Sequence, residues 1–168
     1  MIFAIPEALV HLAAPWNTFY SHSKTAATIV IFLHIAPLVI GGGAAIALDR
    51  ASLRLRHDEP GARARHLAEL GSVHPLVLAA LTLSFLSGVA LLAADLDTFL
   101  GSWIFWLKMG LIVALLANGA IMTRLERALA SPKGESAEQW GRLRGIAIAS
   151  LTLWLAITLA GVALANFS

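Results

Sequence analysis

The chain has 168 residues, of which 58% are hydrophobic and only 13% are charged, and its mean hydropathy is +0.78. This composition excludes a small soluble domain, and the length excludes several domains. We therefore expect one integral membrane domain over residues 1–168. The sequence contains no cysteine, which excludes disulfides, thiolate metal sites and cysteine nucleophiles.

The N-terminal stretch, residues 1–24, lacks the basic region of a signal peptide, and two prolines, Pro6 and Pro15, interrupt it. It is too broken to be a further membrane span. We expect a short interfacial helix that starts at Pro6, with its aromatic side chains at the level of the lipid headgroups on the outer face.

Four apolar segments follow, at residues 25–48, 73–94, 102–123 and 145–166. Each has about 20 residues, the length that crosses a hydrocarbon core of about 30 Å. They lack the alternation of apolar and polar residues that is typical of membrane strands. We therefore expect an all-α fold, an integral membrane four-helix bundle made of two helical hairpins.

Charges predict the orientation of the bundle. Lys and Arg gather between the first and second segments and between the third and fourth, whereas the middle connection carries Asp95 and Asp97. The positive-inside rule places both basic loops in the cytoplasm and both termini on the periplasmic side of a bacterial inner membrane. Because the basic residues lie next to membrane ends without interleaved aromatics, the pI near 9.5 indicates topology and no nucleic-acid partner.

His34 is the first ionisable residue within an apolar segment, about 13 Å from its outer end. A titratable side chain at this depth is costly enough to indicate a function. Pro37 leaves the Leu33 carbonyl free, which predicts a kink beside the imidazole. Two interpretations stay open: His34 binds a cofactor, or it is a structural residue that hydrogen-bonds Ser84 or Ser87 of the second helix.

Lys108 lies about 9 Å from the same outer boundary, on the third segment. It could extend its ammonium group to the interface beside Trp103 and Trp106. It could equally be a partly buried amine that pairs with an anionic group of a ligand or binds a metal. The sequence alone leaves these two interpretations even.

The remaining polar residues give weaker signals. His74 precedes Pro75 at the inner end of the second segment, and we expect an interfacial or helix-start residue there, with a metal ligand as the alternative. His57 and His66 belong to the arginine-rich loop and are expected to be solvated. Asn118 is expected to make an interhelical hydrogen bond. The helical pattern after Gly61 predicts that the second helix starts before the membrane.

The pattern resembles a broad group of small four-helix bacterial membrane proteins. The shared features are a first-helix "LH" followed by small residues, an arginine-bearing inner loop, a proline opening the second helix, and a third helix that starts "W...WLK". The group includes the haem-binding, membrane-bound protoporphyrinogen oxidases and the copper resistance protein D domain. The segment "FLHIAPLVIGGGAAIALDRASLRL" is most similar to a related, uncharacterised family.

In the oxidases, a first-helix histidine and a third-helix lysine are tied to haem and activity, and they match His34 and Lys108 here. The resemblance thus implies a haem b site with His34 as the axial ligand of the iron. It implies that Lys108 is the second ligand or a partner of a haem propionate.

These observations together predict a haem b-binding membrane protein that takes part in electron transfer, alone or within a larger respiratory or photosynthetic complex. Its expected partners are the lipid bilayer, lipid-soluble quinones and further subunits of a homo- or hetero-oligomer. The alternatives are a protoporphyrinogen oxidase-like enzyme, a cofactor-free structural subunit and a copper-related transporter.

Overall fold

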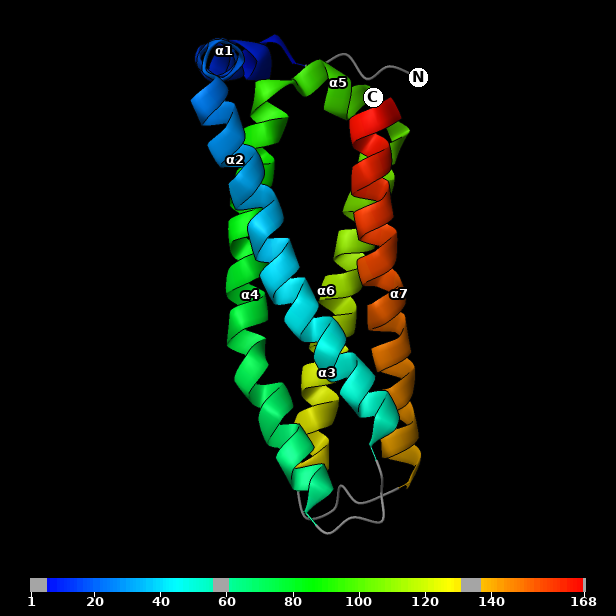
Figure 1. The fold of residues 1–168 in the computed structure, drawn as a ribbon. Helices are drawn as coiled ribbons and strands as arrows, with labels where there is room; N and C mark the ends of the chain where they lie inside the picture. Colours follow the sequence, from blue (N-terminus) through cyan, green and yellow to red (C-terminus); the bar gives the residue numbers. More distant parts are fainter. Residues whose placement is uncertain (1–5, 56–60, 131–136, 168) are drawn as a thin grey trace.

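The computed structural model describes residues 6–55, 61–130 and 137–167, and within these ranges the chain is helical with no strand (Figure 1). The expected all-α fold is therefore confirmed. The elements in chain order are α1 (Glu7–His22), α2 (Lys24–Pro37), η1 (Leu38–Gly42), α3 (Gly43–Arg54), α4 (Ala62–Ala94), α5 (Leu96–Gly101), α6 (Trp103–Leu129) and α7 (Ala137–Phe167).

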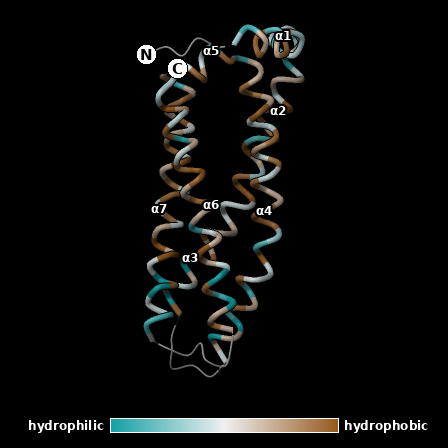
Figure 2. Tube along the Cα trace, turned by 180° about the vertical axis from the view of Figure 1, so that it is seen from behind, coloured by the Kyte–Doolittle hydropathy of each residue, from teal (hydrophilic) through white to brown (hydrophobic). Residues whose placement is uncertain are grey.

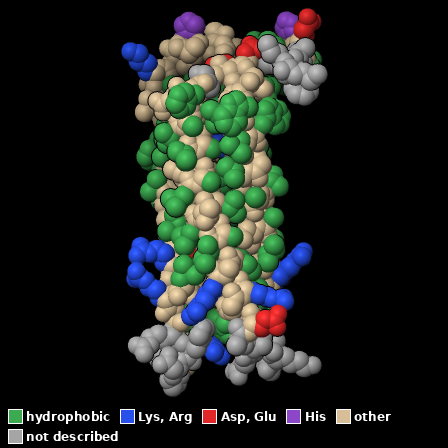
Figure 3. Space-filling model, turned by 90° about the vertical axis from the view of Figure 1, so that its right-hand side faces the viewer, with side chains coloured by type: hydrophobic (Ala, Val, Ile, Leu, Met, Phe, Trp, Pro, Cys, Tyr) green, Lys and Arg blue, Asp and Glu red, His purple; other side chains and the backbone are tan. Residues whose placement is uncertain are grey.

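Four stretches of helix are long and apolar enough to cross a membrane, namely Lys24–Arg54, Ala62–Ala94, Trp103–Leu129 and Glu138–Phe167. They identify a multi-pass membrane protein, as expected. Hydrophobic side chains cover the middle of the bundle, and Lys and Arg side chains gather toward the end that holds the long connections (Figure 3). The hydropathy of the trace follows the same division, with hydrophilic residues concentrated toward that inner end (Figure 2).

The helices extend further at the inner end than the apolar segments predict. The predicted boundaries of 48 and 123 are replaced by Arg54 at the end of α3 and Leu129 at the end of α6. The difference arises because these last turns are amphipathic: they bury one face against neighbouring helices while charged residues occupy the other. A search for apolar runs ends too early in such turns.

The helix expected near the N-terminus is present as α1, and it lies at the end of the bundle beside α2 and α4 (Figure 1). It starts after Pro6, and Pro15 lies inside it without ending it. Two side chains attach α1 to the outer end of α4. Trp16 Nε1 donates a hydrogen bond to the Ala90 carbonyl (2.8 Å), and Asn17 Nδ2 donates one to the Ala94 carbonyl (2.5 Å).

The predicted distortion beside His34 takes the form of a π-helical turn, η1, that follows Pro37 directly. Pro37 has no N–H, so the Leu33 carbonyl loses its partner within the helix. The hydroxyl of Ser87 on α4 lies 3.2 Å from that carbonyl oxygen, and the Ser84 hydroxyl lies 3.2 Å from the His34 carbonyl oxygen. Serine hydroxyls of the neighbouring helix thus lie within hydrogen-bonding distance of both carbonyls, although the Ser87 hydroxyl lies closer to the Leu83 carbonyl oxygen of its own helix (2.9 Å).

Helix α4 starts at Ala62, after Gly61 in the left-handed conformation (φ +73°), so the second helix does begin before its apolar segment. Pro75 lies inside this helix. The expectation that it opens the second helix, and that His74 belongs to the helix start, is therefore wrong. Only one carbonyl, that of Gly71, loses its helical donor to Pro75, and the helix continues through it.

The bundle consists of two helix pairs, α2 with α4 and α6 with α7. The pairs run apart in the outer half and come together in the inner half, where α3 packs against both α7 and α4 (Figure 1). Glycines permit the close approaches: a Cβ atom at Gly41 would overlap Ala80 Cβ, and one at Gly42 would lie 3.0 Å from the Trp154 ring. Asn118 Nδ2 donates to the Ile146 carbonyl at 3.2 Å, which confirms the expected interhelical hydrogen bond.

Candidate functional site

Hydrogen bonds to α4 fix the His34 imidazole. Its Nδ1 lies 2.9 Å from the Ser84 carbonyl oxygen and 3.3 Å from Ser87 Oγ. A carbonyl oxygen can only accept, so we assign the ring hydrogen to Nδ1 and the lone pair to Nε2. Among the described residues Nε2 has no hydrogen-bond partner. The contact expected of a structural histidine is thus present, and it leaves the nitrogen that could bind a metal free.

The same helix provides space for the ring. A Cβ atom at Gly88 would lie 3.2 Å from His34 Cε1, which is closer than most Cβ contacts in proteins. The imidazole therefore lies directly over the backbone of α4 and is only half-buried. Helix α4 both orients this side chain and leaves one edge of it accessible.

Lys108 is also half-buried and also lies beside a glycine, since its Nζ is 3.5 Å from the position of a Cβ at Gly161 on α7. Gly161 is about 9 Å inside the outer end of α7 by helical rise, so the lysine side chain crosses to α7 at its own depth. Its ammonium group makes no hydrogen bond or ion pair with any residue that the structure describes. Its charge acts electrostatically on His34.

His34 and Lys108 thus belong to different helix pairs, at similar depth in the half of the bundle where the pairs run apart. One residue offers an imidazole lone pair, and the other an amine without an anionic partner in the described part of the chain. Gly88 and Gly161 remove the side chains that would otherwise cover them. The arrangement can hold a group that accepts coordination from a nitrogen and carries negative charge.

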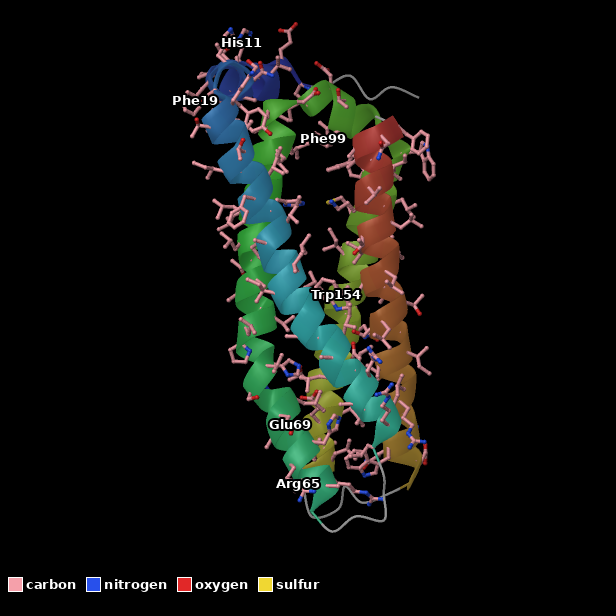
Figure 4. The ribbon with its side chains drawn as sticks, in the orientation of Figure 1. His11, Phe19, Arg65, Glu69, Phe99 and Trp154 are labelled. Atoms are coloured by element: carbon pink, nitrogen blue, oxygen red, sulfur yellow. The ribbon has the colours of Figure 1, made fainter. Side chains whose placement is uncertain are left out.

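A second polar region lies in the inner half, around a cavity of about 250 Å³ between α3, α4, α6 and α7. Most of its lining is apolar and includes the indole of Trp154, which lies where the helix pairs converge (Figure 4). Its polar lining side chains come from all four helices: Asp49, His74, Asn118, Thr123 and Ser150.

Within this region, His74 connects α4 with α6. Its Nδ1 lies 2.8 Å from the Leu70 carbonyl oxygen and 3.6 Å from Glu126 Oε2, and its Nε2 lies 3.1 Å from Thr123 Oγ1. Both groups facing Nδ1 accept hydrogen bonds, so Nδ1 carries a hydrogen. His74 is therefore a fixed part of the interior and no helix-start residue.

Two buried carboxyl groups accompany it. Asp49 is 4% exposed and Glu126 is 9% exposed, and the two interact electrostatically. Ser150 hydrogen-bonds the Asp49 carboxyl group, but Asp49 Oδ2 and Glu126 Oε1 have no hydrogen-bond partner among residues 6–55, 61–130 and 137–167. Buried polar atoms are almost always satisfied in folded proteins, so unpartnered carboxyl oxygens indicate a missing donor.

Sequence analysis misses both carboxyl groups because the predicted segments stop at residues 48 and 123. A signal is nevertheless present in α6: Leu115, Met122, Glu126 and Leu129 are all buried and share one helical face. A glutamate at an apolar position of a helical repeat marks an interior group.

His66 requires a correction as well. It is only 4% exposed, and its Nε2 lies 2.8 Å from Ser52 Oγ on α3, whereas the sequence predicts a solvated loop residue. The reason is that α4 starts at Ala62, which places His66 in a helix that packs against α3. His57 lies outside the described residues.

The described residues contain no group of three or more His, Asp or Glu side chains that could hold a metal ion. The alternative in which His74 is a metal ligand therefore lacks companion ligands there. Haem iron differs, since the porphyrin supplies four ligands and the protein only one or two. Comparisons of the chain with models of protein families, with curated proteins and with solved structures find no match.

Proposed function

We propose that the protein binds one haem b in the outer half of its bundle and takes part in electron transfer across or along a bacterial inner membrane, with both termini on the periplasmic side. The observation that carries this proposal is the state of His34. Its ring is held through Nδ1–H by the Ser84 carbonyl, and its Nε2 has no hydrogen-bond partner in the part of the chain that the structure describes. Histidines that bind metals are oriented in this way, by a hydrogen bond from the other ring nitrogen.

The residues present fit a haem. His34 would bind the iron through Nε2, and the Ser84 carbonyl would keep the ring in the required tautomer. Lys108 would be the second axial ligand or would pair with a propionate, since it has no other partner among the described residues. When bound, haem b supplies reversible one-electron chemistry at its iron.

The test is an absorption spectrum of the detergent-purified protein after haem-replete expression, oxidised and reduced, with a pyridine haemochrome assay for stoichiometry. We expect a b-type reduced spectrum at about one haem per chain, the number that a single histidine site can hold. A stable, folded and colourless protein would refute the proposal.

A variant pair assigns the ligand. His34→Ala is expected to lose the haem while the helices still insert, because the free Nε2 is removed. His11→Ala is the matched control, since His11 is an exposed histidine of α1 at the outer end (Figure 4). Normal haem content in His34→Ala would overturn the ligand assignment. Lys108→Ala is expected to shift the spectrum or weaken haem retention.

A further inference from the structure

We propose that the inner cavity binds the ring of a lipid-soluble quinol, and that a quinol hydroxyl donates a hydrogen bond to the free oxygen of Asp49. This site is separate from the outer one and contains neither His34 nor Lys108. Binding of the quinol is independent of the haem. Only the use of that quinol as an electron source rests on the proposed function.

The size and the opening of the cavity fit one aromatic ring that arrives from the bilayer. A volume of about 250 Å³ exceeds the roughly 150 Å³ that accommodates benzene in an apolar protein cavity. Four of its lining residues are exposed on the surface of α4 and α6: Leu78, Leu116, Gly119 and Ala120. The cavity therefore opens sideways between α4 and α6, within spans whose outer surface is apolar.

The chemistry of the lining selects a hydrogen-bond donor. Asp49 Oδ2 is buried and has no hydrogen-bond partner within the described chain, and an ionised carboxyl group can only accept. A quinol hydroxyl can donate to it, whereas a quinone carbonyl cannot. The second carboxyl group, Glu126, acts electrostatically on Asp49 and disfavours any anionic ligand. A permanently charged amine would have to leave water for hydrocarbon before reaching the opening, which costs several kcal/mol.

The remaining walls suit the ring. The Trp154 indole lines the cavity and offers an aromatic face, and leucines of α4 and α6 complete the apolar surface. His74 lies at the polar end, where Glu126 and Thr123 hold its imidazole in place from α6. Glu126 does not line the cavity and acts as a positioning residue for His74.

The opening can be tested with one substitution and a matched control on the same helix. The probe is tritiated decylubiquinol. We measure the saturable binding of this probe to nanodiscs that contain the protein, after subtracting the amount taken up by empty nanodiscs. A Cβ at Gly119 or at Gly110 meets no atom within 4 Å, so the first atom of a larger side chain has room at either position. Only Gly119 lines the cavity. We expect Gly119→Leu to weaken binding about tenfold or more through obstruction, and Gly110→Leu to leave it unchanged.

The hydrogen bond is tested by two further comparisons at pH 8, where a carboxyl group is ordinarily ionised. Asp49→Asn turns an acceptor into a side chain that can present its NH₂ group to the cavity, and we expect about tenfold weaker binding of the quinol. The exposed Asp97→Asn is the control and should have no effect. The dimethyl ether of the same quinol, which has no donor, should bind the wild type about tenfold less tightly than the quinol does.

Equal binding of the quinol and its dimethyl ether would overturn the proposal, and so would wild-type affinity in Gly119→Leu. The His34→Ala variant separates this proposal from the haem site. It should bind the quinol with unchanged affinity even though it holds no haem. Loss of quinol binding in His34→Ala, with the helical content and the size of the particle preserved, would contradict a separate inner site.

Discussion

At the scale of single residues, His34 satisfies two descriptions that the sequence presents as alternatives. It hydrogen-bonds the Ser84 carbonyl, as a structural histidine would, and it retains a free nitrogen, as a ligand would. Both properties are compatible because different atoms are used. The serine hydroxyls lie beside the Leu33 and His34 carbonyls that precede Pro37, while the imidazole hydrogen-bonds a serine carbonyl. The sequence predicts that His34, Ser84 and Ser87 could interact, but it does not show which of their atoms form the hydrogen bonds.

Substitution of Ser87 tests the value of this arrangement. We expect Ser87→Ala to lower the free energy of unfolding by about 1 kcal/mol, because the Leu33 carbonyl would lose the α4 hydroxyl that lies within hydrogen-bonding distance of it. Thr82→Ala is the control on the same helix, since the exposed Thr82 hydroxyl bonds only its own helix, at Leu78. Unfolding by sodium dodecyl sulfate in mixed micelles, followed by circular dichroism, measures both variants. Equal losses would show that the Leu33 contact contributes nothing.

The room beside the imidazole leads to a second residue-scale prediction. Gly88→Ala places a methyl group 3.2 Å from His34 Cε1, so the ring must move by a few tenths of an ångström. We expect a shifted reduced α-band or a changed reduction potential in the haem-loaded protein. Gly110→Ala, which meets open space, should leave both quantities as in the wild type. Unchanged spectra and potential in Gly88→Ala would mean that the ring position is not set by this contact.

At the scale of elements, sequence locates the four spans and the N-terminal helix but misplaces their inner ends. Apolar runs identify hydrocarbon-facing helix, which is what hydropathy measures. The last turns of α3 and α6, around Asp49 and Glu126, are stabilised by burial of one face only. A hydropathy average includes the charged face as well, so its value falls and the predicted segment ends too early. The two inner carboxyl groups are missed for this reason, although His74 and Asn118 of the same region are noted, whereas His34 and Lys108 are found because they interrupt purely apolar surroundings.

The contact between η1 and α4 provides the element-scale prediction. Gly41→Ala would bring a methyl group into overlap with Ala80 Cβ, so the two helices must separate. We expect a loss of about 1–3 kcal/mol in unfolding free energy, typical of overpacking. Gly43→Ala meets nothing within 4 Å and serves as the control, with an effect near zero or slightly stabilising. Comparable stability of the two variants would contradict this packing.

At the scale of the whole molecule, the described chain has α1, α5 and the C-terminal end of α7 at one end, and the ends of α3 and α6 with the starts of α4 and α7 at the other (Figure 1). The orientation of these ends relative to the membrane is a prediction from charge. Because the sequence has no cysteine, single cysteines report it directly.

We expect Asp97→Cys to react with a membrane-impermeant maleimide in intact spheroplasts, and Arg142→Cys to react only after the membrane is permeabilised. Both positions are exposed in the fold, so a difference between them reflects the membrane. The reverse pattern would invert the proposed topology and place the His34 region toward the cytoplasm.

The π-helical turn of η1 changes how the inner half of the first transmembrane helix, α3, is rotated about the helix axis relative to its outer half, α2. A turn closed by i→i+5 bonds holds about one residue more than an α-turn, and one residue equals about 100° of rotation. The π-turn over Leu38–Gly42 therefore rotates the face that carries Asp49 by about 100° relative to the face that carries His34, compared with an uninterrupted α-helix. A chain with one residue fewer in this segment would stay helical above and below it, yet would rotate Asp49 away from the inner cavity while Ser84 still held His34. The outer and inner halves of this helix are therefore aligned independently. A single insertion or deletion in the π-turn would change the rotation of Asp49 relative to His34.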